Sequence, residues 1–292
     1  MASLDDLKKR IASVKSTQKI TKAMKMVAAA KLKKAQESAE NGRPYSERMQ
    51  NIILNLTKSI NDKSNAPKLL FGNGKDNIYL GVVMTADRGL CGGFNSNICK
   101  LAKKKFKEYL SNGKTLKIIT VGSKGYDQLK RDFKKNIIEK KSFKDRKKIS
   151  FSEAEEIGKL ILDLFDNEQF DKCFLFFNNF KNVITQIPQA KQIIPANYQN
   201  EEDQLDNSSS YEFEPEEDEI LEDLLPKNIS TQIYTAFLEN SASEQGSRMT
   251  AMDNATRNAG DLVDKLTINY NRSRQAAITK ELIEIISGAE SL

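Results

Sequence analysis

Both ends of this 292-residue chain are long stretches almost free of residues that break helices. Ser3 and Asp6 form a pattern typical of a helix N-cap, and after them neither Gly nor Pro occurs until Gly42 and Pro44. At about 1.5 Å per residue, a helix of this extent is roughly 58 Å long. Most helices in proteins owe their stability to packing, so the sequence predicts a partner for this one.

Apolar residues recur along this first segment at steps of three and four, as on one face of a helix. They are Leu4, Leu7, Ile11, Val14, Ile20, Met24, Val27, Leu32, Ala35 and Ala39. Pro44 should kink or end the helix. Further apolar residues from Met49 onward indicate that helical structure continues toward Ile60.

The carboxyl-terminal end has the same character. Residues 228–287 contain no proline, and Gly288 stands where a helix stop is expected. Steps of three and four, typical of a coiled-coil seam, connect Met252, Ala255, Ala259, Leu262, Leu266, Asn269, Ser273 and Ala276. We expect the two ends to pair as an antiparallel coiled coil. The alternative is that each stripe merely faces a globular core.

The middle of the chain alternates between strand and helix patterns. Strands are expected at 78–85, 116–121 and 172–177, with 183–187 as a hairpin partner, and helices at 96–110 and from a Ser152 cap to 165. This order predicts a mostly parallel, Rossmann-like α/β domain in three layers, without a nucleotide site. The expected division is a coiled-coil helix over 1–60, the α/β domain over 76–197, an acidic connection over 198–226 and a coiled-coil helix over 227–287.

Charge is distributed unevenly behind the net value of +6. Residues 1–60 hold 13 basic and 5 acidic residues, and residues 100–150 hold 18 and 5. Between Lys191 and Lys227 there are 12 acidic residues and no basic one. Such runs are either solvated surface or contacts with charged partner surfaces.

Several classes of protein are disfavoured by composition. No apolar run approaches the ~20 residues of a membrane helix, and the first ten residues resemble no targeting signal, which favours a soluble bacterial protein. The three cysteines form no Cys-x-x-Cys pair and the chain has no histidine. We therefore expect reduced thiols, no metal site and no cofactor.

A glycine-rich turn follows the first expected strand, at Asp87–Phe94, and invites comparison with nucleotide-binding loops. Its glycines do not have the Gly-x-Gly-x-x-Gly spacing. A second imitation, Gly113-Lys114-Thr115, fails as a P-loop because Glu108 occupies the position of the first glycine. Without histidine, and with no base evident for Cys91, catalytic residues are not expected in this chain.

Three blocks of residues carry a more specific signal than these patterns. They are Ile11–Met24 continuing through Lys31, then Thr85–Asn95, and finally Glu239–Met252 with Tyr270–Leu282. In content and order these blocks resemble the γ subunits of F-type ATP synthases, over the whole chain.

The resemblance implies a non-catalytic rotor that couples proton translocation to ATP synthesis and hydrolysis in the β subunits. Implied partners are the α and β subunits, the ε subunit and the membrane ring, with peripheral attachment at the cytoplasmic face of a bacterial membrane. Residues implied to contact the β subunits are Met24, Glu244, Arg248, Arg274, Gln275 and Thr279, and Tyr211 and Glu212 are implied to contact the ε subunit and the membrane ring. Without the resemblance, the pattern favours an ordinary intrahelical ion pair for Glu244 and Arg248, and core packing for Met24.

Two other functions compete. The Lys-rich helix Lys100–Lys107 and the pI of about 8.9 suit a basic coiled-coil adaptor that binds nucleic acid, although no aromatic ladder accompanies the basic runs. A nucleotide-dependent enzyme is disfavoured by the failed phosphate motifs.

Overall fold

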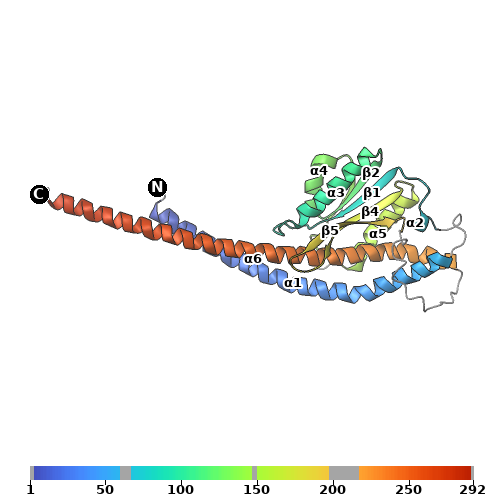
Figure 1. Cartoon of the computed structure of the whole chain (residues 1–292), viewed down its shortest axis with the longest axis horizontal. Coiled ribbons are helices and arrows are strands. Elements are labelled where there is room, and N and C mark those ends of the chain that lie inside the picture. Colours follow the sequence, from blue (N-terminus) through green and yellow to red (C-terminus); the bar gives the residue numbers. More distant parts are fainter. Residues whose placement is uncertain (1–2, 60–66, 147–149, 197–216, 291–292) are drawn as a thin grey trace. The chain divides into compact units, whose positions relative to one another are not determined.

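The computed structural model describes residues 3–59, 67–146, 150–196 and 217–290. They form two compact units, one of residues 1–29 with 248–292 and one of residues 30–247. Two long helices, α1 (Leu4–Ser59) and α6 (Glu217–Glu290), each run through both units (Figure 1). The remaining elements belong to the larger unit.

A five-stranded sheet in the order β3-β2-β1-β4-β5 forms the centre of the larger unit. All neighbouring strands are parallel except β4 and β5, which form an antiparallel hairpin. The strands are β1 (Ile78–Met84), β2 (Thr115–Val121), β3 (Ile137–Lys141), β4 (Lys172–Phe180) and β5 (Gln186–Ile194). The expected mostly parallel, Rossmann-like sheet is confirmed.

Helices cover both faces of the sheet, and the central strands β1, β2 and β4 are accordingly buried along most of their length. The helices of the larger unit are α2 (Lys68–Phe71), α3 (Phe94–Ser111), α4 (Ser123–Phe133) and α5 (Phe151–Asp166), together with parts of α1 and α6. Val83 of β1 faces a core formed with α3 and α4, whereas Val82 and Met84 face a core formed with α5 and α6. The predicted three layers are therefore present.

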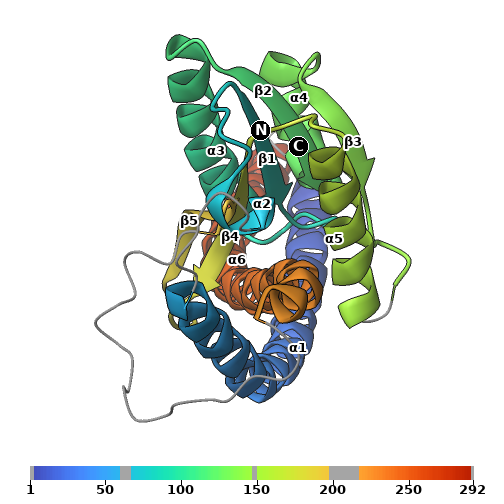
Figure 2. The same ribbon diagram turned by 90° about the vertical axis from the view of Figure 1, so that its right-hand side faces the viewer.

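In the larger unit, α6 lies between the sheet and α1 (Figure 2). Ile233 and Phe237 of α6 pack into the sheet core, while Leu238 contacts Gly42 of α1. Farther along, Ile53 of α1 packs with Leu221 of α6 in a separate apolar cluster. The same helix thus completes the α/β core and pairs with α1.

The long helices continue past the expected breaks. α1 runs through Pro44 to Ser59, and Pro44 and Glu40 are both exposed, so water can satisfy the Glu40 carbonyl that loses its helical partner. α6 begins at Glu217, inside the range expected for the acidic connection, and passes Gly288 before ending at Glu290. Pro44 and Gly288 therefore do not end these helices, whose other residues favour helical structure.

Three elements were missed, the four-residue α2 among them, and others begin elsewhere. β3 and α4 were not expected, because the short β3 has alternating half-buried and exposed residues and is rich in charge. α5 is capped by Ser150, not Ser152, in a capping box with Glu153. The hairpin partner of β4 is Gln186–Ile194, later than the expected 183–187, and β4 itself extends to Phe180.

Gly122, between β2 and α4, holds a backbone position that other residues rarely adopt. Its φ is 98°, and a Cβ there would lie 2.2 Å from the carbonyl oxygen of Thr85. Gly113 also has a positive φ, of 73°, but a Cβ there would meet no atom within 4 Å. A substitution at Gly113 thus introduces backbone strain alone, whereas one at Gly122 introduces both strain and steric overlap.

Gly122→Ala is therefore expected to lower the free energy of unfolding by about 3 kcal/mol or more, since it adds overlap to strain. Gly113→Ala should cost only about 1–2 kcal/mol, the strain alone. Urea unfolding of the full-length chain, followed by circular dichroism, measures both values. Equal losses for the two variants would contradict the steric argument.

Candidate functional site

In the smaller unit, α1 and α6 pair side by side in opposite directions. Lys25 forms an ion pair with Asp253, and the Thr256 hydroxyl donates to the Thr21 hydroxyl over 2.7 Å. Numbers rise along α6 as they fall along α1, so the predicted antiparallel pairing is confirmed.

The seam of this pair is shifted from the predicted one on α6. Leu262 is 43% exposed, and Asn269 and Ala276 are also exposed. The residues that face α1 are buried or half-buried and keep the three-four spacing: Met252, Thr256, Ala259, Val263, Leu266, Tyr270 and Ser273. The predicted three-four spacing is confirmed, but every second seam residue was predicted one position too early, such as Leu262 in place of Val263.

The seam of α1 is partly polar. Leu7 is buried and Ile11 and Val14 are half-buried as predicted, but Ile20 and Val27 are exposed. In their place the inward positions are Gln18, Thr21, Lys25 and Ala28. These residues bury less apolar surface than a Leu/Ile seam, so polar contacts contribute much of the specificity of the register.

The ion pair in this seam is pH-dependent. The hydrogen bond from Lys25, together with one from Arg257, holds the pKa of Asp253 below its ordinary value. A lowered carboxyl pKa means that the pair stabilises the fold above the unfolded-state pKa and loses this contribution as the pH falls through the folded-state pKa.

The last turns of α6 extend beyond the first residue of α1 within this unit (Figure 1). Continuing the register of the pair places Leu4 near Arg274, so the residues after it lack an α1 neighbour. Five large apolar side chains are exposed there, and we call them the apolar tip: Ile278, Leu282, Ile283, Ile285 and Ile286. An apolar surface on a bare helix indicates a partner surface.

The predicted site residues near this tip are all exposed. Arg274, Gln275 and Thr279 are solvent-accessible, and the Thr279 hydroxyl donates to the Gln275 carbonyl over 3.0 Å. That bond satisfies the Thr279 donor inside its own helix. Arg274 and Gln275 are exposed, so a partner can reach them.

The other predicted contact residues are more enclosed. Met24 of α1 and Glu244 and Arg248 of α6 are half-buried. Glu244 lies in the larger unit, whereas Met24 and Arg248 lie in the smaller one. Tyr211 and Glu212 fall outside the described residues.

The glycine-rich turn uses its polar side chains on the protein itself. Asp87 accepts hydrogen bonds from the backbone N–H of Ser123 and Phe143 and from the Ser142 hydroxyl, at 2.7–3.1 Å. The Thr85 hydroxyl oxygen accepts from the Gly125 N–H over 2.8 Å. The turn thus joins the ends of β1, β2 and β3, a role that sequence reasoning missed because its partners are 36 to 56 residues away.

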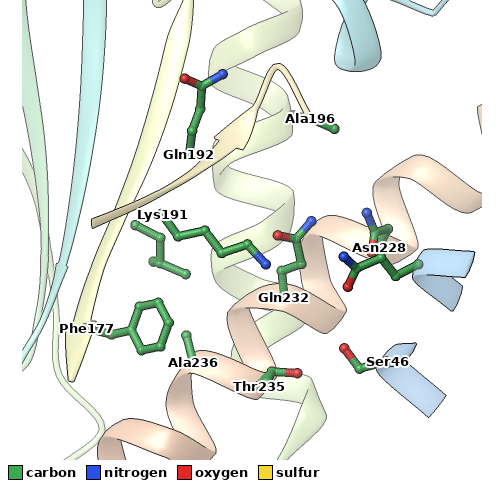
Figure 3. A pocket seen from close by; sticks show the side chains of 11 residues that line it. Ser46, Phe177, Lys191, Gln192, Ala196, Asn228, Gln232, Thr235 and Ala236 are labelled. Carbon is green, nitrogen blue, oxygen red and sulfur yellow. The ribbon is translucent and has the colours of Figure 1, made fainter. Parts of the chain in front are cut away.

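A small cavity lies in the larger unit between α1, α6 and the β4–β5 hairpin (Figure 3). Its volume is about 70 Å³, and Lys191 and Gln232 converge on it. Small-molecule pockets usually measure about 300–1,000 Å³. The polar lining and the size suit a few water molecules, not a nucleotide.

The three cysteines are all enclosed by the fold. Cys91, Cys99 and Cys173 are buried thiols, and burial raises the pKa of Cys99 to about 11 and that of Cys173 further. Among the residues that the structure describes, no group of three His, Cys, Asp or Glu side chains is placed to hold a metal ion. No described helix is both long and apolar enough to cross a membrane.

These features define the class of protein: a coiled coil of the two chain ends, joined to a mostly parallel α/β domain, with an apolar helix end that requires a partner. The protein-family model for ATP synthase matches residues 3–292. The ATP synthase gamma chain of Pelagibacter ubique is 70% identical over 292 residues, covering all of both chains. That of Rhizobium leguminosarum bv. trifolii is 57% identical over 294 residues, again with full coverage.

Solved structures agree. A chain in the central stalk and c-ring structure of Tetrahymena thermophila mitochondrial ATP synthase is 30% identical, with a TM-score of 0.60, covering 81% of this chain and 99% of that one. A chain of the Euglena gracilis mitochondrial ATP synthase has the same fold at 19% identity, with a TM-score of 0.66 over 99% and 94%. The chain therefore belongs to the family of ATP synthase gamma chains.

The shifted seam can be tested with two leucines of α6. Leu266 is 6% exposed in the seam and Leu262 is 43% exposed beside it. Leu266→Ala should lower the free energy of unfolding by about 2–3 kcal/mol, and Leu262→Ala by less than about 1 kcal/mol. Thermal unfolding followed at 222 nm measures the difference. A larger loss of unfolding free energy for Leu262→Ala than for Leu266→Ala would favour the seam predicted from the sequence.

Proposed function

We propose that this chain is the central-stalk rotor of a bacterial F-type ATP synthase, coupling proton translocation to ATP synthesis and hydrolysis. The full-length 70% identity to an ATP synthase gamma chain is the observation that carries the proposal. The nucleic-acid alternative gains no support from these relatives. The chain works as a subunit of the complex, and we infer that it is itself non-catalytic, with ATP made in the β subunits.

The proposed assembly has three contacts. The coiled coil of residues 1–60 and 227–287 enters the ring of α and β subunits, and the α/β domain of residues 76–197 forms the foot near the membrane ring. The ε subunit binds at this foot, where Tyr211 and Glu212 of the 198–226 connection are the proposed contacts. The chain is thereby held peripherally at the cytoplasmic face of the bacterial membrane.

Coupling in this proposal is mechanical. A single asymmetric shaft contacts several β sites at once, so each site meets a different face and is biased toward a different nucleotide state. Each proton crossing about 100 mV supplies about 2.3 kcal/mol, so the shaft must carry the work of several protons without yielding.

The exposed apolar tip is the observation behind a proposed bearing, in which a partner surface surrounds the end of the shaft. An exposed cluster of Ile and Leu side chains is costly in water and is covered by a partner of similar chemistry. A smooth apolar sleeve contributes burial without directional bonds, so the helix end can turn inside it. Arg274 and Gln275, one turn before Ile278, are then placed to hydrogen-bond a β-subunit loop above the sleeve. Met24, Glu244 and Arg248 are proposed to meet the moving β lobes.

Assembly with catalytic subunits is the direct test of this function. Purified full-length chain is mixed with the α and β subunits of the same synthase, and the complex is separated by gel filtration and assayed for ATPase activity. The proposal expects one complex that contains all three chains and is active. Absence of such a complex would remove the rotor function.

The proposed β contact predicts a coupling defect from Arg274→Glu combined with Gln275→Ala. Losing a charge-assisted hydrogen bond and introducing repulsion should lower proton-driven ATP synthesis in reconstituted vesicles about tenfold or more. Arg272→Glu makes the same charge change two residues away, on a different helix face, and should have a smaller effect. Synthesis at the unmodified rate in the double variant would count against this assignment.

A further inference from the structure

The end of β4 extends beyond its ladder with β1. The two strands pair from Tyr79 opposite Lys172 to Val83 opposite Phe176, and β4 continues to Phe180. Because buried backbone groups are nearly always hydrogen-bonded, this end of β4 needs partners from outside the sheet.

Three inward-facing polar side chains within about one turn of α6 supply these partners, and we call them the polar clamp: Glu239, Asn240 and Ser243. The Asn178 N–H donates to Asn240 Oδ1 over 3.2 Å, and the Ser243 hydroxyl donates to the Asn178 carbonyl over 3.1 Å. The Phe180 N–H donates to Glu239 Oε2 over 3.0 Å. All three side chains of the polar clamp are buried, and Ser243 is 0% exposed. They take the place of a neighbouring strand.

Glu239 also joins the third element of this region. Its second carboxylate oxygen lies 3.5 Å from the Arg43 guanidinium of α1. One buried carboxylate of α6 therefore contacts both β4 and α1. A buried charge is tolerated only with such partners, so its position is strictly determined.

The contact continues along α6 for one further turn. A Cβ at Gly246 would lie 3.2 Å from the Phe180 ring, so a larger residue there would push the ring slightly away from the helix. The Ser247 hydroxyl donates to the Cys91 carbonyl of the glycine-rich turn over 2.7 Å. Both ends of the contact thus have a defined register against α6.

The polar clamp differs in kind from the packing that precedes it on the same helix. Ile229, Ile233 and Phe237 contact the sheet through apolar burial, which is non-directional. Hydrogen bonds weaken steeply when the donor, hydrogen and acceptor lose alignment, so they resist a rotation or a slide that apolar contacts tolerate.

We propose that the polar clamp is a torque-bearing joint that fixes the rotational setting of α6 on the sheet. The inference rests on the proposed rotor function. Rotation of the α/β domain reaches the rest of α6 through this joint, and rotation of α6 returns to the domain by the same route. Glu239, Asn240 and Ser243 are positioning residues, since they act through the geometry of the helix.

The test uses the complete ATP synthase, carrying this chain, in sealed vesicles. ATP hydrolysis and proton pumping are measured on the same preparation and expressed per assembled complex. For Ser243→Ala and Asn240→Leu we expect hydrolysis to continue while the protons pumped per ATP fall at least twofold. A purely structural role would lower the amount of complex and leave this ratio unchanged, which would overturn the joint.

Matched variants separate the joint from general damage to α6. Asn240→Asp keeps an oxygen acceptor for the Asn178 N–H and should restore the ratio that Asn240→Leu lowers. Thr235→Val removes a hydroxyl whose 3.0 Å hydrogen bond to the Thr231 carbonyl stays within α6, and should leave the ratio unchanged. A loss for Thr235→Val equal to that for Ser243→Ala would overturn the joint.

A second measurement covers variants that assemble poorly. In single complexes with the catalytic ring fixed, a bead on the α/β domain reports the angular fluctuation of the rotor, and we expect at least a twofold greater variance for Ser243→Ala. Unchanged variance contradicts the joint alone. Failure of the unmodified complex to pump protons would overturn the rotor function itself, and the joint with it.

Discussion

The larger unit depends on the burial of one face of α6 against the sheet. Ile229, Ile233 and Phe237 are almost fully enclosed with β-strand side chains such as Leu175, and each large side chain contributes about 1.5–3 kcal/mol. The opposite side of the same helix contacts α1 at Gly42. A single helix is therefore both a core element of the α/β domain and a member of the helical pair. Its continuous backbone links these two parts of the chain.

Directional polar contacts recur wherever position along a helix matters. In the smaller unit, Lys25 with Asp253 and Thr21 with Thr256 mark the register of the pair, where large apolar side chains are few. Polar residues in a seam cost stability but reject alternative registers. In the larger unit, the polar clamp does the same between α6 and β4. Apolar burial holds these elements together, and the polar contacts determine their alignment.

The glycine-rich turn illustrates how a motif can serve the fold instead of a ligand. Its position after β1 of a parallel sheet is the usual place for a phosphate-binding loop. Here Asp87 and Thr85 bind backbone groups of neighbouring loops, and Cys91 accepts from Ser247 of α6. The turn therefore connects three strand ends to the long helix. The proposed function needs such a connection and needs no nucleotide at this point.

Local periodicity was sufficient to determine two long helices, the alternation of strands and helices, and the fold class, because each depends on residues close in the sequence. It could not decide which face of each helix is covered. Successive residues are only about 100° apart, so Leu262 and Val263 both border the stripe, and contact with α1 alone selects Val263. The roles of Asp87 and of the polar clamp were likewise decided by the tertiary structure. Their hydrogen bonds join residues 36 to 65 positions apart, and only folding brings these together.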